Sequence, residues 1–70
     1  MKGVYKILHE VAERRSNWIK MYRQEPKEVY INEKMYNELK DFYQQKPFAI
    51  WGLNVNIDTN IRSIKDIWVR

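Results

Sequence analysis

The feature that most constrains the fold is the segment Phe48–Asp58, which reads Phe-Ala-Ile-Trp-Gly-Leu-Asn-Val-Asn-Ile-Asp. Within it, Leu53, Val55 and Ile57 alternate with polar residues, which is the period-two pattern of a strand with one buried and one solvated face. Gly52 stands just before the alternation, and a glycine in an apolar run often marks a bulge or a close backbone approach. The rest of the chain must therefore supply elements that cover the apolar face of this strand.

Residues 4–23 predict a helix, because apolar residues recur on one stripe at about 100° per residue. The members of this stripe are Val4, Ile7, Leu8, Val11, Trp18 and Tyr22. Arg15 falls inside the stripe, and we expect its side chain to extend past the edge of the core, with contact to a partner as the alternative. Ser16 and Asn17 favour helix ends over helix interiors, so the sequence leaves open a bend or break at Ser16.

A second helix is predicted over residues 33–45, with Asn32 as its N-cap and Pro47 as its stop. Its apolar stripe consists of Met35, Tyr36, Leu39, Phe42 and Tyr43. Pro26 ends the first helix, because proline lacks the backbone donor and disfavours helical geometry in the residue before it.

Two short segments, Val29–Ile31 and Ile67–Val69, are rich in β-branched and aromatic residues and predict further strands. Val29–Ile31, the second helix and Leu53–Asp58 form a strand–helix–strand unit, whose crossover is right-handed if the strands are parallel. The last two strands flank a turn-rich loop and are expected to pair antiparallel. We therefore expect an α+β domain of order helix, strand, helix, strand, strand. Its mixed sheet has three strands, with Leu53–Asp58 in the middle and two helices on one face.

The length of 70 residues predicts a single domain over residues 1–70, because a second core would not fit. A chain without cysteine has no disulfides or thiolate metal sites, so aromatic packing and self-association remain as supports. No apolar run approaches the roughly 20 residues of a membrane span, and the N-terminus lacks a signal-peptide pattern. We therefore expect a cytoplasmic protein without membrane contact.

The excess positive charge is concentrated at the start of the chain. Residues 1–27 hold seven basic and three acidic side chains, so this segment carries the whole net charge of +4. The basic residues of interest are Arg14, Arg15, Lys20 and Arg23. A solvated helix face explains them most simply, and binding of nucleic acid or of an acidic protein is the alternative.

Candidate catalytic groups are few. His9 and Glu13 have the i, i+4 spacing of helical metal ligands, but the chain has no second histidine, so we expect an exposed pair and no metal. Gly3 and Gly52 are the only glycines, which excludes a glycine-rich phosphate loop. The serines lack a histidine base at any recognisable spacing, and so small a domain rarely has a substrate pocket. The sequence thus predicts a non-enzyme without cofactor or small-molecule substrate.

Several spaced residues between positions 18 and 69 form a recognisable pattern: an Arg-x-x-Pro entry to a strand, a helix with Tyr and Leu, a Gly-x-x-Val-x-x-Asp strand and a final strand with Trp. The residues of this pattern are Arg23, Pro26, Val29, Ile31, Tyr36, Leu39, Gly52, Val55, Asp58 and Trp68. The pattern resembles one found in small, uncharacterised tailed-phage or prophage proteins. At Asn54 the chain departs from the proline that the pattern often has. The resemblance covers roughly residues 18–69 and implies a phage origin but no activity.

The sheet face opposite the helices is the predicted partner site, because Trp and Tyr are enriched in interface hot spots. Its residues are Tyr30, Trp51, Asn54, Asn56 and Trp68. The first hypothesis is an accessory protein that binds another protein or a second copy of itself. A nucleic-acid-binding protein that uses the basic N-terminal helix is the alternative. A virion or assembly component, suggested by a similar strand in tailed-phage capsid proteins, is the third.

Overall fold

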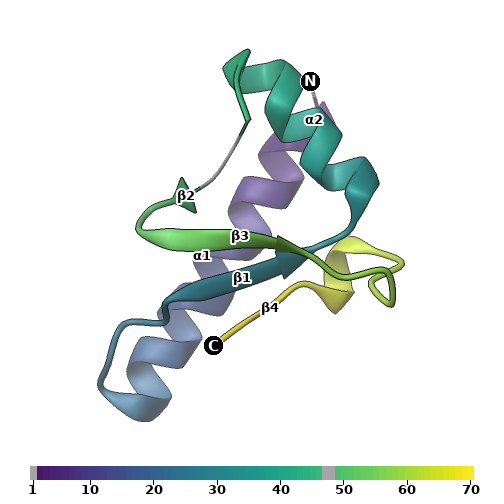
Figure 1. The fold of residues 1–70 in the computed structure, drawn as a ribbon. Helices are drawn as coiled ribbons and strands as arrows, with labels where there is room; N and C mark the ends of the chain where they lie inside the picture. Colours follow the sequence, from purple (N-terminus) through teal and green to yellow (C-terminus); the bar gives the residue numbers. More distant parts are fainter. Residues whose placement is uncertain (1, 47–48) are drawn as a thin grey trace.

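The computed structural model describes residues 2–46 and 49–70, which form an α+β fold with two helices and a four-stranded mixed sheet (Figure 1). The elements in chain order are α1 (Lys2–Tyr22), β1 (Glu28–Ile31), α2 (Glu33–Tyr43), β2 (Ala49–Ile50), β3 (Leu53–Ile57), the 3₁₀ turn η1 (Ile64–Asp66) and β4 (Trp68–Val69). The α+β class is therefore confirmed, but the sheet has four strands and not the expected three. Pro47 and Phe48, which were expected to stop the second helix and lead into the strand, lie outside the described residues.

Helix α1 is continuous through Ser16 and Asn17, which settles the question of a break there. Both side chains are exposed to solvent, so they do not have to find partners within the core. The helix ends where Arg23 adopts a left-handed conformation with φ of 60°, and its amide N–H donates to the carbonyl of Ile19 at 2.8 Å. This is the usual left-handed termination of a helix, with a residue other than glycine.

Helix α2 begins at the predicted N-cap. The Asn32 Oδ1 accepts a hydrogen bond from the Met35 amide at 2.8 Å, and its Nδ2 donates to the Ile61 carbonyl at 3.1 Å. One side chain therefore caps the helix and also holds the segment that follows β3. The helix ends two residues earlier than expected, at Tyr43, because Gln44 takes a left-handed conformation with φ of 56°.

The strand order is β2-β3-β1-β4. Strands β1 and β3 are parallel, and β1 pairs antiparallel with β4 on its other side. The expected pairing of the last two strands is wrong, because the chain between residues 58 and 67 crosses to the far side of β1. The free side of β3 is occupied instead by β2, at the hairpin pair Ile50–Leu53.

The turn of this hairpin is Trp51-Gly52, with φ of 51° and 81°. Two successive positive φ values are those of a type I′ turn, whose twist matches that of two antiparallel strands. Gly52, where a bulge was expected, is thus the second central residue of a hairpin turn. The sequence analysis missed β2, because it treated Phe48–Trp51 only as the approach to the strand.

Both helices and the inward-facing strand residues contribute to one buried cluster, and α1 crosses behind the sheet in Figure 1. The cluster consists of Val4, Ile7, Val11, Val29, Ile31, Met35, Leu39, Ile50, Leu53, Ile61, Ile67 and Val69. Ile57, which was expected to pack under the helices, is 48% exposed. Among the described residues, strand β2 pairs with Leu53 and Asn54 of β3.

The double role of Asn32 predicts different costs for two substitutions. Asn32→Ala removes the cap acceptor and the donor to Ile61, and we expect it to lower the free energy of unfolding by about 1–2 kcal/mol. Asn32→Asp keeps the acceptor and loses only the donor, so its cost should be smaller. Urea denaturation of both variants tests this. An equal loss in both would assign the stabilisation to the bond with Ile61 and contradict the capping role.

Candidate functional site

The sheet face turned away from the core carries a row of side chains from three adjacent strands. The register places Tyr30 of β1 directly opposite Trp68 of β4 and beside Asn56 of β3, with Asn54 one step along on the same face. Among the residues that the structure describes, no helix lies in front of β1 and β3 in Figure 1. The structure thus brings together four of the five residues predicted for this face.

Two aromatic rings form the centre of this face. The rings of Tyr30 and Trp68 are stacked, with centroids 4.0 Å apart and planes inclined by 7°. The Arg70 guanidinium lies 5.3 Å from the Tyr30 centroid and 5.7 Å from the Trp68 centroid, within the range of a cation–π contact. Because the two residues belong to neighbouring strands, the stacking direction runs across the sheet, and each ring covers one face of the other.

Polar contacts surround the stacked rings. A Glu28 carboxylate oxygen accepts from the Asn56 amide at 3.3 Å, and the other lies 3.6 Å from the Arg70 Nε. The Trp68 indole N–H donates to the Asp58 carboxylate at 3.4 Å. These contacts limit the rotation of the Trp68 ring and of Arg70.

Sequence reasoning missed Glu28, Asp58 and Arg70 as members of this surface. For Glu28 and Arg70 a signal existed, because each is two residues away from one of the stacked aromatic residues and so shares its face. Asp58 follows β3, and its contact with Trp68 depends on a strand order that the sequence did not reveal. The name "aromatic face" is used below for Glu28, Tyr30, Asn54, Asn56, Trp68 and Arg70.

Trp51, the fifth predicted residue, is separate from the stacked pair. It occupies the first central position of the β2–β3 turn and is 53% exposed. No ring contact joins it to another aromatic residue within the described part of the chain. A large side chain in a left-handed conformation is uncommon and costs stability, so this tryptophan is retained at an exposed and strained position.

The predicted basic patch does not form one surface. The Arg14 guanidinium lies 3.1 Å from the buried Glu10 carboxylate and donates to the Lys65 carbonyl at 2.9 Å, which ties α1 to η1. Arg15 is paired with Glu25 at 2.7 Å. Lys20 is exposed in the last turn of α1, and Arg23 is exposed just beyond the end of the helix. Two of the four cations are thus already engaged in ion pairs within the molecule.

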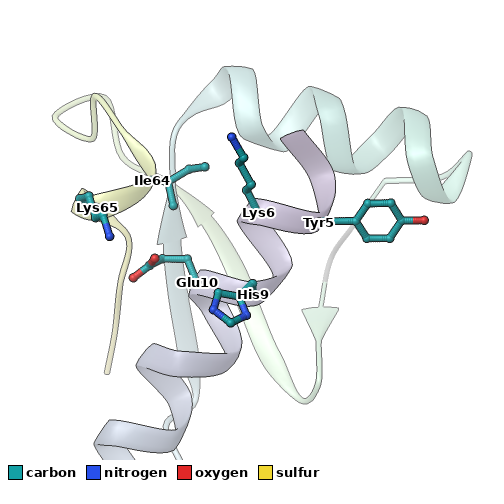
Figure 2. Close-up of a pocket in the computed structure, with 6 residues that line it drawn as sticks. All are labelled: Tyr5, Lys6, His9, Glu10, Ile64 and Lys65. Carbon is teal, nitrogen blue, oxygen red and sulfur yellow. The ribbon is translucent and has the colours of Figure 1, made fainter. Parts of the chain in front are cut away.

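A pocket of about 410 Å³ lies between α1 and η1, lined by Tyr5, Lys6, His9, Glu10, Ile64 and Lys65 (Figure 2). In Figure 2 the Glu10 carboxylate points toward the segment that carries Lys65, whereas the Tyr5 ring points away. Glu10 is 7% exposed and already paired with Arg14. The carboxylate thus holds Arg14, whose guanidinium makes the contact with η1.

The His9 and Glu13 pair is exposed, with 3.8 Å between Nε2 and Oε1. Within residues 2–46 and 49–70, no group of three or more metal-ligating side chains lies close enough together to hold an ion. None of the described helices is both long and apolar enough to span a bilayer.

Comparison of the chain with protein-family models, with curated proteins and with solved structures gives no match. The resemblance to tailed-phage proteins therefore stays a prediction. The arrangement of the residues themselves is the basis for a functional proposal.

The stacking of Tyr30 on Trp68 predicts energetic coupling between them. In a double-mutant cycle with Tyr30→Ala and Trp68→Ala, we expect a coupling of about 0.5–1.5 kcal/mol in the free energy of unfolding. The control cycle combines Trp68→Ala with Tyr5→Ala, an exposed ring on α1 that contacts Phe42 instead. That pair should be additive within about 0.5 kcal/mol. Additivity in both cycles would show that the stack contributes nothing beyond area burial.

The strained turn predicts that a substitution at an exposed tryptophan stabilises the fold. Trp51→Asn places Asn-Gly, the preferred type I′ pair, in the turn, and we expect the free energy of unfolding to rise by about 0.5–1 kcal/mol. Trp51→Ala is the matched control, because it removes the same ring without a preference for positive φ. Thermal and urea denaturation measure both variants. Equal stability of the two would contradict the assignment of strain to this position.

Proposed function

We propose that this chain is a non-enzymatic protein-binding module whose contact surface is the aromatic face. The observation that carries the proposal is the stacked pair Tyr30 and Trp68 with Arg70 beside it, on a sheet face that no described helix covers. Tyrosine, tryptophan and arginine are the residue types that contribute most of the binding energy in protein interfaces.

The ordered state of this surface supports the proposal. Immobilising flexible side chains on binding costs about 0.5–1.5 kcal/mol each. Here Glu28 and Asp58 already restrain Arg70 and Trp68 through their contacts, so less freedom remains to be lost. The asparagines on the same face are small and leave the rings accessible from one side.

Protein binding is favoured over nucleic-acid binding by the carboxylates that lie beside the stacked rings. Glu28 and Asp58 border the same surface and would repel phosphates. Lys20 and Arg23, which are exposed, lie at the end of α1 and not on this face.

A role as a phage accessory protein or assembly component fits this proposal, since such roles need a contact surface and no catalytic groups. Self-association through the aromatic face is one form of this protein-binding role. If the chain self-associates in this way, sedimentation equilibrium at high concentration should show a dimer for the wild type and a monomer for Trp68→Ser.

The test is a comparison of captured proteins, with a matched control. Immobilised wild type, Trp68→Ser and Tyr5→Ser are incubated with lysate of the source cells, with and without nuclease. We expect a protein that the wild type and Tyr5→Ser retain equally, and that Trp68→Ser binds at least about tenfold more weakly once that protein is purified. Capture that disappears with nuclease would indicate nucleic acid. Equal binding by all three chains would exclude the aromatic face as the contact surface.

A further inference from the structure

Within the described residues, one face of the Trp68 indole has no aromatic ring or guanidinium against it. Tyr30 stacks on a single face of the indole, with nearly parallel planes. The Arg70 guanidinium lies 5.3 Å from the Tyr30 centroid and 5.7 Å from the Trp68 centroid. A group on the far side of the indole would be closer to Trp68 than to Tyr30, so Arg70 lies beside the stack. Trp68 is 38% exposed, which leaves its second face accessible.

The carboxylate of Asp58 lies at the edge of this indole. Its Oδ2 accepts from the Trp68 Nε1–H at 3.4 Å, and its Oδ1 accepts from the Asn60 amide at 2.9 Å. Because an indole N–H lies in the plane of its ring, the carboxylate that accepts from it lies close to both ring faces. Both donors are neutral, and none of the ion pairs among the described residues includes Asp58. A carboxylate without a cation thus stands beside an accessible aromatic surface.

The charges around the rings favour a cation at this point. The other carboxylate of the aromatic face, Glu28, lies 3.6 Å from the Arg70 Nε, so these two charges offset one another and that of Asp58 remains. The net charge of +4 belongs to residues 1–27, whereas residues 28–70 hold six basic and six acidic side chains. Helix α1 carries five of the basic side chains and crosses behind the sheet, on the side away from the aromatic face (Figure 1).

We propose that Trp68 and Asp58 bind an arginine side chain of the partner protein. The guanidinium would lie against the accessible face of the indole and donate N–H groups to the carboxylate at its edge. Arginine suits this site because its guanidinium is planar, stacks on aromatic rings and directs several donors toward one carboxylate. A lysine ammonium is a strongly hydrated point charge, and an acidic side chain would be repelled by Asp58. The inference rests on the proposed protein-binding function and specifies the chemistry of the partner.

The probe is the capped tripeptide N-acetyl-Gly-Arg-Gly-amide, titrated into the isotopically labelled wild-type chain. The readout is the NMR signal of the Trp68 indole N–H, which is identified among the three tryptophans by its loss in Trp68→Phe. We expect a saturable shift with a dissociation constant of about 1–10 mM. Two matched probes carry citrulline, which has the shape of arginine without its charge, or lysine. Each should bind at least about fivefold more weakly.

Two protein variants locate the site. Asp58→Asn keeps an oxygen that can accept from the indole but removes the charge. We expect it to bind the arginine probe about tenfold more weakly and the citrulline probe almost unchanged. Asp41→Asn is the control, because it removes the same charge from an exposed position on α2 and should leave both affinities unchanged. The comparison of probes uses the wild type alone, so it decides the inference even if Asp58→Asn does not fold.

Three results would overturn the inference. The first is no saturable shift of the Trp68 signal up to about 50 mM of the arginine probe. The second is equal binding of the arginine and citrulline probes, which would exclude a role for charge. The third is equal binding of the lysine probe, which would indicate a site for any cation.

Capture from lysate separates this inference from the proposed function. A protein that Asp58→Asn retains as well as the wild type does, but that Trp68→Ser loses, would support the aromatic face as the contact surface and contradict the arginine site. If Trp68→Ser captures the same proteins as the wild type, the proposed function fails, and the tripeptide titration still decides whether Trp68 and Asp58 select arginine.

Discussion

The constraint on which the rest of the structure depends is that β1 is hydrogen-bonded along both of its edges. The carbonyls of Lys27 and Ile31 accept from the amides of Asn54 and Asp58. On the other edge, Glu28 exchanges two hydrogen bonds with Arg70, and Tyr30 is paired with Trp68 of β4. The same four-residue strand directs Val29 and Ile31 into the core and Tyr30 to the opposite face. The register of β1 thus determines both the packing of the core and the pairing of Tyr30 with Trp68, and a slip by one residue would reverse the two faces.

Elements that depend on local patterns could be predicted from the sequence. Both helices and β3 follow from the spacing of apolar residues, and the α2 N-cap follows from Asn32 alone. The neighbour of β4 could not be predicted in this way. The loop after Asp58 is compatible with a return to either side of the β1–β3 pair. In the structure β2 takes the place beside β3, and β4 lies beside β1 in contact with α1. Strand β2 has two residues and no periodicity to detect.

In the candidate site, too, some features follow from local sequence patterns and others depend on the order of the strands. Alternation placed Tyr30, Asn54, Asn56 and Trp68 on one face, because period two is a local property of strands. Their contacts depend on strand order, which is why the stacking of the two rings, the position of Arg70 and the bond from Trp68 to Asp58 appear only in the structure. The basic residues show the opposite case. Their proximity in sequence suggested a patch, but the turn of the helix and the ion pairs with Glu10 and Glu25 separate them.

Two choices in this sequence do not serve the stability of the isolated fold. Trp51 occupies a turn position that favours asparagine, and Met21 is largely exposed. Natural sequences depart from local rules mainly where function requires it. Trp68 differs from these two residues, because its stack on Tyr30 contributes to the fold and also places an aromatic ring on the outer face of the edge strand.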